Sequence, residues 1–478
     1  MGRKSGARII GGGEMRRKVK QHILAWLGVI TLLAVFPANG AVKDQFILRC
    51  SPAAVSGIAS RHGMTVLASV AGQNIFLVRG PAGASATQFI ADVEADAEVG
   101  AFEQNADVVV PESLAGLQLN QSTASILDQL ANPTVISFFG SQVLGSYVNQ
   151  PAAVLIRNAE AHQFLATGAG IVAVIDTGVD PNHPVLQASL VPGFDFTRNA
   201  PGIPSEFADL MQSTASILDQ STASILDQNT IVVLNQSTAS ILDQSTASIL
   251  DSTQIPRSFG HGTMVAGIIH LVAPTAQIMP LKAFTADGSS NLFDILRAIY
   301  FAVDHGAQVI NMSFSFLDPS QELMRAVNFA SGRGVICVSS TGNLGKETLA
   351  FPASFQNVVG VASTNNLDMR STFSSFGAAL ADMAAPGEGI ITTFPGKHYA
   401  AAWGTSFSTP FVSGAAALLV QVRPRIQPKD AFEALAHAKE LEPGLGWGRL
   451  DLYNALFSRL KILPPGAPAP GGVPSAGN

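Results

Sequence analysis

The sequence predicts an α/β fold in which a parallel sheet is sandwiched by helices, with a small α+β domain in front of it. In the second half of the chain, short apolar runs alternate with longer amphipathic segments, as is typical of strand–helix units. Upstream of them, 171–175 is an apolar, β-branched run followed by Asp-Thr-Gly, which favours a buried parallel strand. The composition fits such a core, since 47% of the residues are hydrophobic and only 13% are charged.

The alternating part of the chain defines the main elements of the sheet. Strands are expected at 277–283, 308–312 and 335–339, and helices are expected between them at 292–304 and 321–331. Alternation of this kind places helices on both faces of a parallel sheet. A chain of 478 residues is long for one domain, so we expect this domain to cover 151–462 and a smaller one to precede it.

Residues 42–111 have a different pattern, which predicts the small domain. Strands and helices follow one another in the β-α-β-β-α-β order of the ferredoxin-like arrangement. The expected elements are a strand at 45–48, a helix at 52–62, two strands within 64–79, a helix at 85–95 and a last strand near 107–110. One interpretation of this segment is a small binding domain that stays attached to the chain.

The first 41 residues predict a targeting segment. A basic stretch at 15–20 precedes an apolar run at 23–36, and small residues follow at 38–40. This order is typical of a signal peptide, and the apolar run is short for a membrane span. We therefore expect cleavage near Gly40 or Ala41 and an exported protein, either secreted or periplasmic. An uncleaved membrane anchor is the alternative. We expect the protein to contact a membrane only in that case.

The charge argues against a nucleic-acid-binding protein, and the cysteines argue against a disulfide-linked fold or a cysteine-bound metal. The net charge is −6 and no Lys/Arg cluster occurs outside the N-terminus, which excludes nucleic acid as an expected partner. The chain has two cysteines, Cys50 and Cys337, and the second lies in an apolar run where cysteine behaves as a small hydrophobe. We expect no disulfide between them, and two isolated cysteines do not form a metal site.

One octapeptide, Gln-Ser-Thr-Ala-Ser-Ile-Leu-Asp, occurs five times without a mismatch. One copy begins at Gln121, inside a linker expected at 112–150, and two tandem pairs lie within 212–251. Because the unit is short and its copies are scattered, we expect a tolerated, mobile surface insertion rather than a solenoid, with a partner-binding loop as the alternative. The Pro/Gly-rich tail at 463–478 is expected to be disordered.

Three short segments carry the residues of a nucleophilic hydrolase. Asp176 follows the run at 171–175, and sites gather at the carboxyl ends of strands in open α/β sheets. His261 and Ser406 each precede an apolar stretch expected to be helical, so both should lie at helix N-termini. A serine hydroxyl needs an imidazole to remove its proton, and the imidazole needs a carboxylate to fix its tautomer. We therefore predict Asp176, His261 and Ser406 as a catalytic triad.

The segments around these residues resemble the motifs of the subtilase family, in the same order along the chain. The resemblance runs from about residue 158 to residue 456. The five motifs that carry it are 171–180, 260–267, 309–313, 340–343 and 404–410. The chain departs from the family pattern at Met264, Phe407 and Ser408, where members often carry His, Met and Ala.

This resemblance implies a subtilisin-like catalytic domain and a serine endopeptidase that acts on proteins or peptides. It implies that the Asn343 side chain is an oxyanion donor and that Ser313, Phe314 and Ser315 flank the substrate. It also implies that 42–111 is an inhibitor-type prodomain, which blocks its own catalytic domain until it is removed. A catalytically silent binding protein and an esterase or acyl transferase on the same scaffold are the alternatives.

The resemblance also bears on metals. Relatives often bind a structural calcium through an aspartate after a His-Pro pair, and here that position is Val185, whose side chain has no oxygen ligand. We therefore expect this one site to be absent, while structural calcium elsewhere stays open. The chemistry requires no cofactor and no metal, since the triad and the oxyanion donors handle the proton and the charge.

Overall fold

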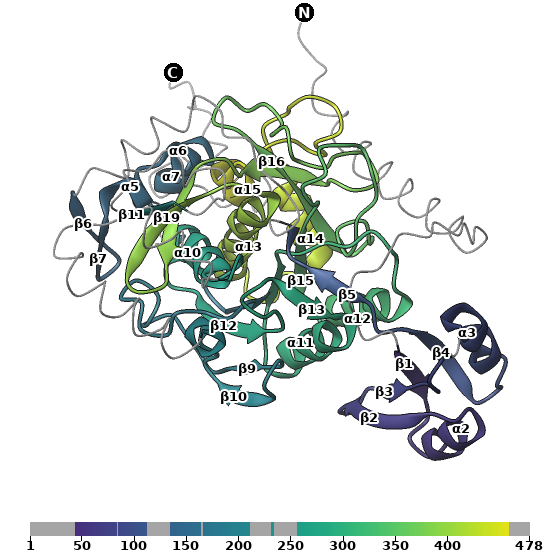
Figure 1. The fold of residues 1–478 in the computed structure, drawn as a ribbon. Coiled ribbons are helices and arrows are strands. Elements are labelled where there is room, and N and C mark those ends of the chain that lie inside the picture. The colour runs from purple at the N-terminus through teal and green to yellow at the C-terminus, as the bar shows by residue number, and fades with distance from the viewer. Residues whose placement is uncertain are drawn as a thin grey trace, which may run out of the picture.

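The computed structural model describes residues 44–83, 85–111, 134–163, 166–210, 231–233 and 256–457. The predicted leader, the linker repeat and the tail at 463–478 lie outside the described residues, as does the repeat insertion apart from 231–233. The described chain forms a small N-terminal domain and a larger α/β domain beside it (Figure 1).

The N-terminal domain is a four-stranded antiparallel sheet, ordered β2-β3-β1-β4, with two helices on one face. Its elements are β1 (Gln45–Cys50), α2 (Val55–Arg61), β2 (Thr65–Val70), β3 (Ile75–Arg79), α3 (Ala86–Glu94) and β4 (Val99–Gln104). This is the predicted ferredoxin-like arrangement. The prediction of its last strand near 107–110 was wrong, because β4 takes that place and the following segment leaves the sheet.

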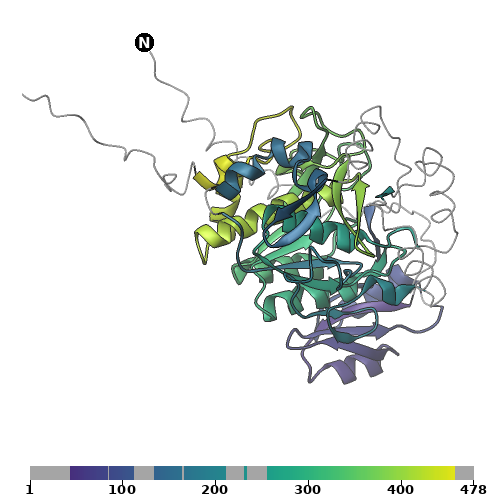
Figure 2. The same ribbon diagram turned by 90° about the vertical axis from the view of Figure 1, so that its left-hand side faces the viewer.

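The second face of this small sheet packs against the larger domain. Ile47 and Ile75 are fully buried there, in the core that contains α11 (Leu292–Asp304) and α12 (Gln321–Gly332). Figure 2 shows the N-terminal domain, in purple, directly below the larger domain. The two domains therefore share an apolar interface.

The larger domain is built on an eight-stranded sheet that is parallel from β9 to β17 and ends in an antiparallel edge strand, β10. From one edge to the other its strands are β10 (Ala200–Gly202), β9 (Gly193–Asp195), β12 (Gln277–Lys282), β8 (Ile171–Asp176), β14 (Val309–Met312), β15 (Ile336–Ser340), β16 (Val358–Thr364) and β17 (Met383–Pro386). The predicted strand–helix alternation is confirmed, with α11 and α12 lying between the strands as expected.

Smaller elements complete the larger domain. Its further helices are α5 (Gly145–Val148), α6 (Pro151–Leu155), α7 (Asn158–Gln163), η2 (Glu206–Asp209), α10 (His261–Val272), α13 (Thr405–Val422), α14 (Pro428–Leu435) and α15 (Leu452–Phe457). Its remaining strands are β6 (Val135–Phe138), β7 (Ser141–Leu144), β11 (Ile231–Val233), β13 (Ser289–Asn291), β18 (Ile390–Phe394) and β19 (His398–Ala402), and a short strand, β5 (Asp107–Val109), precedes them. β5 belongs to the chain between the domains and pairs with β13.

The strands of the sheet contribute side chains to two layers of core. Val172 and Val174 of β8 pack with α10 and α13, whereas Ala173 and Ile175 pack with α11 and α12 on the opposite face. This alternation follows from the two-residue period of a strand. Among the described residues, α13 is the one helix long and apolar enough to span a membrane, and 89% of its apolar window is buried inside the molecule. It is a central core helix.

Both cysteines are free. Cys337 lies in β15 and is fully buried, and this burial raises the pKa of its thiol to about 12. Cys50 ends β1 in the core of the N-terminal domain. The two thiols thus belong to different cores and act as small apolar side chains.

Candidate active site

Asp176 and His261 lie side by side at the carboxyl edge of the sheet. Asp176 is the last residue of β8, and His261 is the first residue of α10. His261 Nδ1 lies 2.7 Å from Asp176 Oδ1, and the two residues are only 2% and 1% exposed. Because a carboxylate accepts a hydrogen bond, Nδ1 carries the proton and Nε2 is the basic nitrogen of the ring.

Two glycines allow these segments to approach each other. A Cβ at Gly262 would lie 2.1 Å from the carbonyl oxygen of Gly178 and 3.2 Å from Asp176 Oδ1. Gly178 itself has a φ of +106°, which residues with a side chain rarely adopt, and a Cβ there would lie 2.9 Å from Pro204 O. The glycines in the Asp-Thr-Gly and His-Gly-Thr segments are therefore required by close contact.

Ser406 lies in the first turn of α13 and is fully buried. The ring of the next residue, Phe407, lies 5.3 Å from the ring of His261, centroid to centroid. Ser406 Oγ donates to the carbonyl oxygen of Ser313 at 3.0 Å, and Ser313 Oγ donates to the carbonyl oxygen of Ser406 at 2.9 Å. The fold thus brings the predicted nucleophile to the same edge of the sheet as the Asp176–His261 pair.

Asn343 lies in the loop after β15, against the N-terminus of α13. Its side-chain oxygen accepts hydrogen bonds from the backbone N–H of Thr405 at 3.0 Å and from Thr405 Oγ1 at 2.9 Å. These bonds orient the carboxamide so that its NH₂ group is directed away from Thr405. An amide donor held in this way beside Ser406 suits a negative charge developing on an oxygen.

The segment predicted to flank the substrate follows β14. Ser313 contacts Ser406, as described above, and Ser315 lies against the Asn343 loop, since a Cβ at Gly342 would lie 2.8 Å from Ser315 Oγ. Phe314 is fully buried, and its ring lies 5.2 Å from that of Phe284. The side chain of Phe314 therefore belongs to the core, and its carbonyl oxygen accepts from the buried Ser339 Oγ at 3.4 Å.

Sequence reasoning missed the strand β13 (Ser289–Asn291), which pairs antiparallel with β5 of the interdomain segment. Val110 N also donates to Gly288 O at 2.9 Å. Val108 and Val110 are each 1% exposed, and both pack into the core of the larger domain. A polar Ser-Ser-Asn segment lacks the alternating apolar pattern of a strand. It forms a strand here because β5 pairs with it, and this pairing is not visible in the local sequence.

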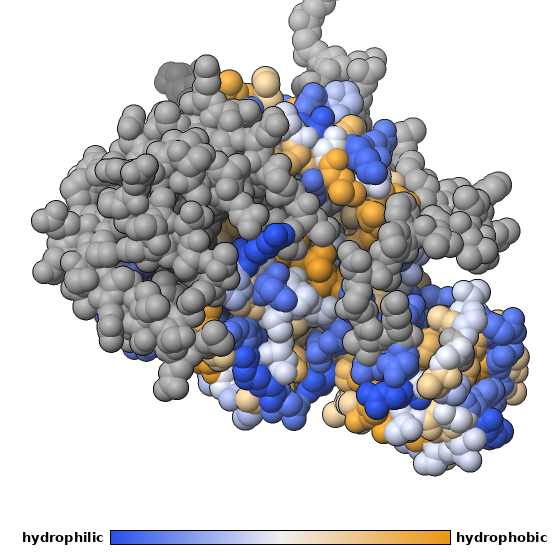
Figure 3. Space-filling model, in the orientation of Figure 1, coloured by the Kyte–Doolittle hydropathy of each residue, from blue (hydrophilic) through white to orange (hydrophobic). Residues whose placement is uncertain are grey.

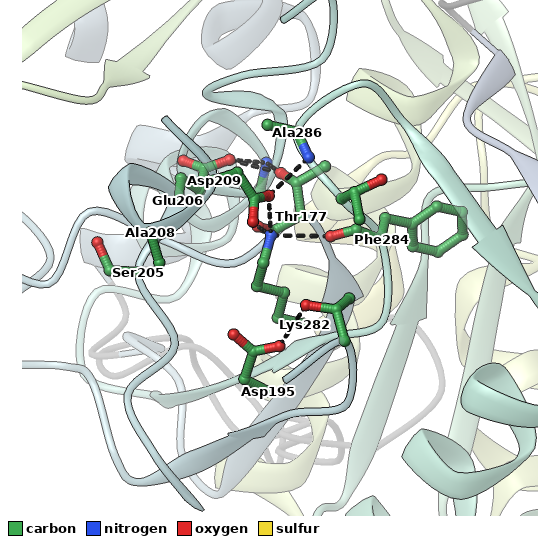
Figure 4. Close-up of polar contacts among 12 residues, drawn as sticks. Thr177, Asp195, Ser205, Glu206, Ala208, Asp209, Lys282, Phe284 and Ala286 are labelled. Carbon is green, nitrogen blue, oxygen red and sulfur yellow. Dashed lines mark hydrogen bonds and ion pairs between the residues drawn. The ribbon is translucent and has the colours of Figure 1, made fainter. Parts of the chain in front are cut away.

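A second part of the site that sequence reasoning missed is Glu206, the first residue of η2. It is fully buried behind the Asp176–His261 pair, where it bonds Thr177 and Thr263. Figure 4 shows Glu206 and Thr177 together with the neighbouring ion pair of Lys282 and Asp209. Glu206 precedes the long polar insertion, and such a position normally indicates an exposed loop.

Val185, where relatives were expected to place a calcium ligand, is 1% exposed and packs in the main core. Within the described ranges, no three His, Cys, Asp or Glu side chains are grouped as metal ligands. The polar groups gathered at this edge of the sheet are thus an imidazole, hydroxyls, carboxylates and an amide.

A family model described as the subtilase family matches residues 168–449, more than half of the chain. The chain belongs to the subtilase family. The matched range includes all three predicted triad residues and both glycines that bring Asp176 and His261 together. It excludes the N-terminal domain.

Named relatives of this subtilase match parts of it. The thermophilic serine proteinase of Bacillus sp. (strain AK1) is 33% identical over 300 residues, 60% of this chain and 61% of that protein. Subtilisin Savinase of Lederbergia lenta is 40% identical over 174 residues, 34% of this chain and 64% of that protein. The match to these first relatives thus covers somewhat less than two thirds of their length. Thermitase of Thermoactinomyces vulgaris is 31% identical over 61% of this chain and 90% of its own.

A solved structure shares the fold of this subtilase. The crystal structure of fervidolysin from Fervidobacterium pennivorans, described as a keratinolytic enzyme related to subtilisin, is similar with a TM-score of 0.62 at 21% identity. The similarity covers 88% of this chain and 62% of that one. The predicted subtilisin-like fold is therefore confirmed.

Proposed function

We propose that this chain is an exported serine endopeptidase that hydrolyses peptide bonds through an acyl-enzyme. The observation that carries the proposal is the 2.7 Å contact between His261 Nδ1 and Asp176 Oδ1, at the edge of the sheet where α13 presents Ser406. Family membership supports the same activity, since several relatives are named as serine proteinases or subtilisins.

In the proposed reaction, Ser406 Oγ attacks the carbonyl carbon of the scissile peptide bond while His261 Nε2 takes its proton. Asp176 holds the imidazole in the required tautomer and stabilises the imidazolium. His261 then returns the proton to the leaving amine, and the acyl group stays on Ser406. Water, deprotonated by His261, attacks this ester and releases the acid, which restores the Ser406 hydroxyl.

The negative charge of each tetrahedral intermediate needs donors that are already in place. The Asn343 NH₂ group and the backbone N–H of Ser406, at the positive end of α13, are suited to this role. The bonds from Thr405 to Asn343 Oδ1 support this assignment, because they hold the carboxamide at the N-terminus of α13, next to Ser406. Replacing Asn343 with Ala should lower kcat by about 10²–10³-fold.

The N-terminal domain is proposed to inhibit the site until it is cleaved off. β5 supports this role, because it pairs with β13 as an extended peptide substrate would pair with an exposed strand edge. The backbone of 313–315 lies beside Ser406 and is proposed as the second contact for such a peptide. Removal of the N-terminal domain would therefore free β13 for substrate.

No metal enters the proposed reaction, and the calcium position at Val185 is proposed to be absent. We expect full hydrolytic activity in excess EDTA at moderate temperature, with at most a modest fall in Tm. A rapid, calcium-reversible loss of activity would show that another calcium site holds the enzyme together.

The experiment that tests the function compares the purified chain with its Ser406→Ala variant on matched peptide and ester substrates. We expect hydrolysis of both by the natural chain and of neither by the variant. Hydrolysis of esters alone would favour an esterase, and no hydrolysis of either would favour a silent binding protein. N-terminal sequencing of the species found outside the cell tests export and gives the maturation site.

A further inference from the structure

A second carboxylate lies behind Asp176 and His261, and the proposed reaction does not use it. Glu206 is fully buried, and its backbone N–H donates to Val179 O at 3.2 Å, which ties it to the loop after β8. Val179 N in turn donates to Pro204 O at 3.0 Å. Burying a charged group is expensive unless hydrogen bonds compensate, so the partners of Glu206 indicate what it does.

The side chain of Glu206 bonds both of the segments that carry the pair. Its Oε1 accepts from Thr177 Oγ1 at 2.5 Å and from Gly262 N at 3.2 Å, and its Oε2 accepts from Thr263 Oγ1. Thr177 directly follows the aspartate, and Gly262 and Thr263 directly follow the histidine. One carboxylate therefore bridges two segments that lie 85 positions apart in the sequence.

The directions of these bonds suit a carboxylate at this position. Thr177 Oγ1 accepts from Gly262 N at 2.9 Å, and Thr263 Oγ1 accepts from Asp180 N at 2.8 Å. Each hydroxyl oxygen is thus already an acceptor, and each hydroxyl donates to Glu206. The Thr177 hydroxyl also lies 3.3 Å from Asp176 Oδ1, a longer contact than its 2.5 Å bond to Glu206. A carboxylate has only acceptors, so it satisfies all the donors that face it.

The charged groups that act on Glu206 are Asp176 of β8 and Lys282 of β12, which in turn contact His261 of α10 and Asp209 of η2. Burial raises the pKa of Glu206 to about 7, while its hydroxyl partners and Lys282 act in the opposite direction and Asp176 adds to the rise. Lys282 is fully buried and donates to Asp209 Oδ2 at 2.6 Å (Figure 4). The carboxylate of Glu206 therefore prevails above about pH 7.

We propose that Glu206 is a positioning residue, whose carboxylate sets the placement of Asp176 relative to His261 by bonding the residues that follow each of them. The inference rests on the proposed function and assigns to that reaction a further residue. Glu206 acts on the geometry and the charge of the pair and has no bond to β13 or to 313–315. Its loss should therefore lower kcat and leave KM nearly unchanged.

Two variants distinguish the effect of the charge of Glu206 from the effect of its side-chain length. Glu206→Gln keeps the length and removes the charge, whereas Glu206→Asp keeps the charge and is one methylene shorter. The control is Asp195→Asn, because Asp195 is a buried carboxylate nearby whose partners, Thr197 and Arg198, lie in its own turn. Kinetics on a chromogenic peptide would be measured for each variant across the pH range of activity.

Both Glu206 variants are expected to lower kcat by about 10–100-fold, with KM changed by less than about two-fold. Glu206→Gln should also move the part of the kcat/KM acid limb above about pH 7, where Glu206 carries its charge, to lower pH, because removing a nearby negative charge disfavours the imidazolium. Glu206→Asp should leave that limb in place, and Asp195→Asn should change neither quantity.

A second readout does not depend on turnover. In the Ser406→Ala background, the Nδ1–H proton of His261 should shift or broaden in ¹H NMR spectra of both Glu206 variants and stay unchanged with Asp195→Asn. The proposal would be overturned if both Glu206 variants had the same kcat as the unsubstituted chain and the same acid limb of the kcat/KM profile. Failure of both to fold would also overturn it, since Glu206 would then serve stability alone. An inactive natural chain would refute the proposed function, and the proton resonance would still test this inference.

Discussion

The N-terminal domain and the larger domain bury their apolar residues in different ways. Every residue of α13 from Thr405 to Val420 is buried inside the larger domain. In the N-terminal domain, the first five residues of β2 are exposed, with Val66 and Leu67 at 41% and 37%. Figure 3 shows the resulting mixture of hydrophobic and hydrophilic surface at the lower right, where this domain lies.

This difference indicates that the N-terminal domain depends on the larger domain for its stability. Separation would expose Ile47 and Ile75, which are now fully buried between the domains, and would break the pairing of β5 with β13. A domain of fewer than 70 residues has little apolar core to spare. We therefore expect the N-terminal domain to be stable mainly while docked, whereas the larger domain keeps both layers of its own core.

The largest expected effect comes from removing the nucleophile. Ser406→Ala should lower kcat by about 10⁶-fold, because His261 and Asp176 then have no hydroxyl to activate. The same change should leave the precursor uncut, so that both domains stay in one chain. Gel analysis of the purified variant measures this. Normal processing without any other protease would show that the chain does not mature itself.

The second-largest expected effect is a loss of stability of the larger domain in acid. Burial lowers the pKa of His270 and His398 to about 4, against about 6.5 in an unfolded chain. Between these values His270 and His398 are each more protonated in the unfolded chain, so the contribution of the neutral imidazoles is complete above about pH 6.5 and is lost as the pH falls toward 4. Calorimetry of the Ser406→Ala chain should show Tm falling over this interval, and less so with His270→Gln. An unchanged Tm from pH 7 to pH 4 would contradict this account.

A smaller effect is expected from weakening the domain interface alone. Glu103 Oε1 accepts from Ser320 Oγ at 2.7 Å and Glu103 Oε2 accepts from Gln321 N at 3.1 Å, at the N-terminus of α12. Glu103→Ala should raise the dissociation constant of the cleaved N-terminal domain about ten-fold, the equivalent of losing a helix cap. Glu94→Ala, at an exposed position of α3, is the control. Equal binding by both variants would remove Glu103 from the interface energetics.

The smallest effect should follow deletion of 212–251. The chain on either side of the insertion already meets, since Asp209 Oδ2 accepts from Ala286 N at 2.7 Å and Ser258 N donates to Ala286 O at 2.8 Å. β11, at the edge of the β18–β19 pair, is the described strand that would be lost. Activity on small peptides should stay within about two-fold of the natural chain. Insoluble or inactive protein would mean that the repeats are structural.

Local sequence patterns predicted the elements whose signals lie within a few residues. α11 was expected at 292–304 and spans Leu292–Asp304, because its apolar period and the Asn291 cap are both local. The run at 107–110 predicted a strand correctly and its sheet wrongly, since its partner β13 lies about 180 residues away. The burial of Glu206 depends likewise on Thr177 and Thr263, which reach it only in the folded chain.

The most direct test of the central claim is to label the purified chain with a fluorophosphonate, which reacts with activated serines, and to locate the adduct by mass spectrometry. We expect one adduct per chain, on the peptide that contains Ser406, and none in the His261→Ala variant, because the serine then has no base. Absence of an adduct, an adduct on another serine, or full labelling of His261→Ala would contradict the claim that Asp176 and His261 activate Ser406.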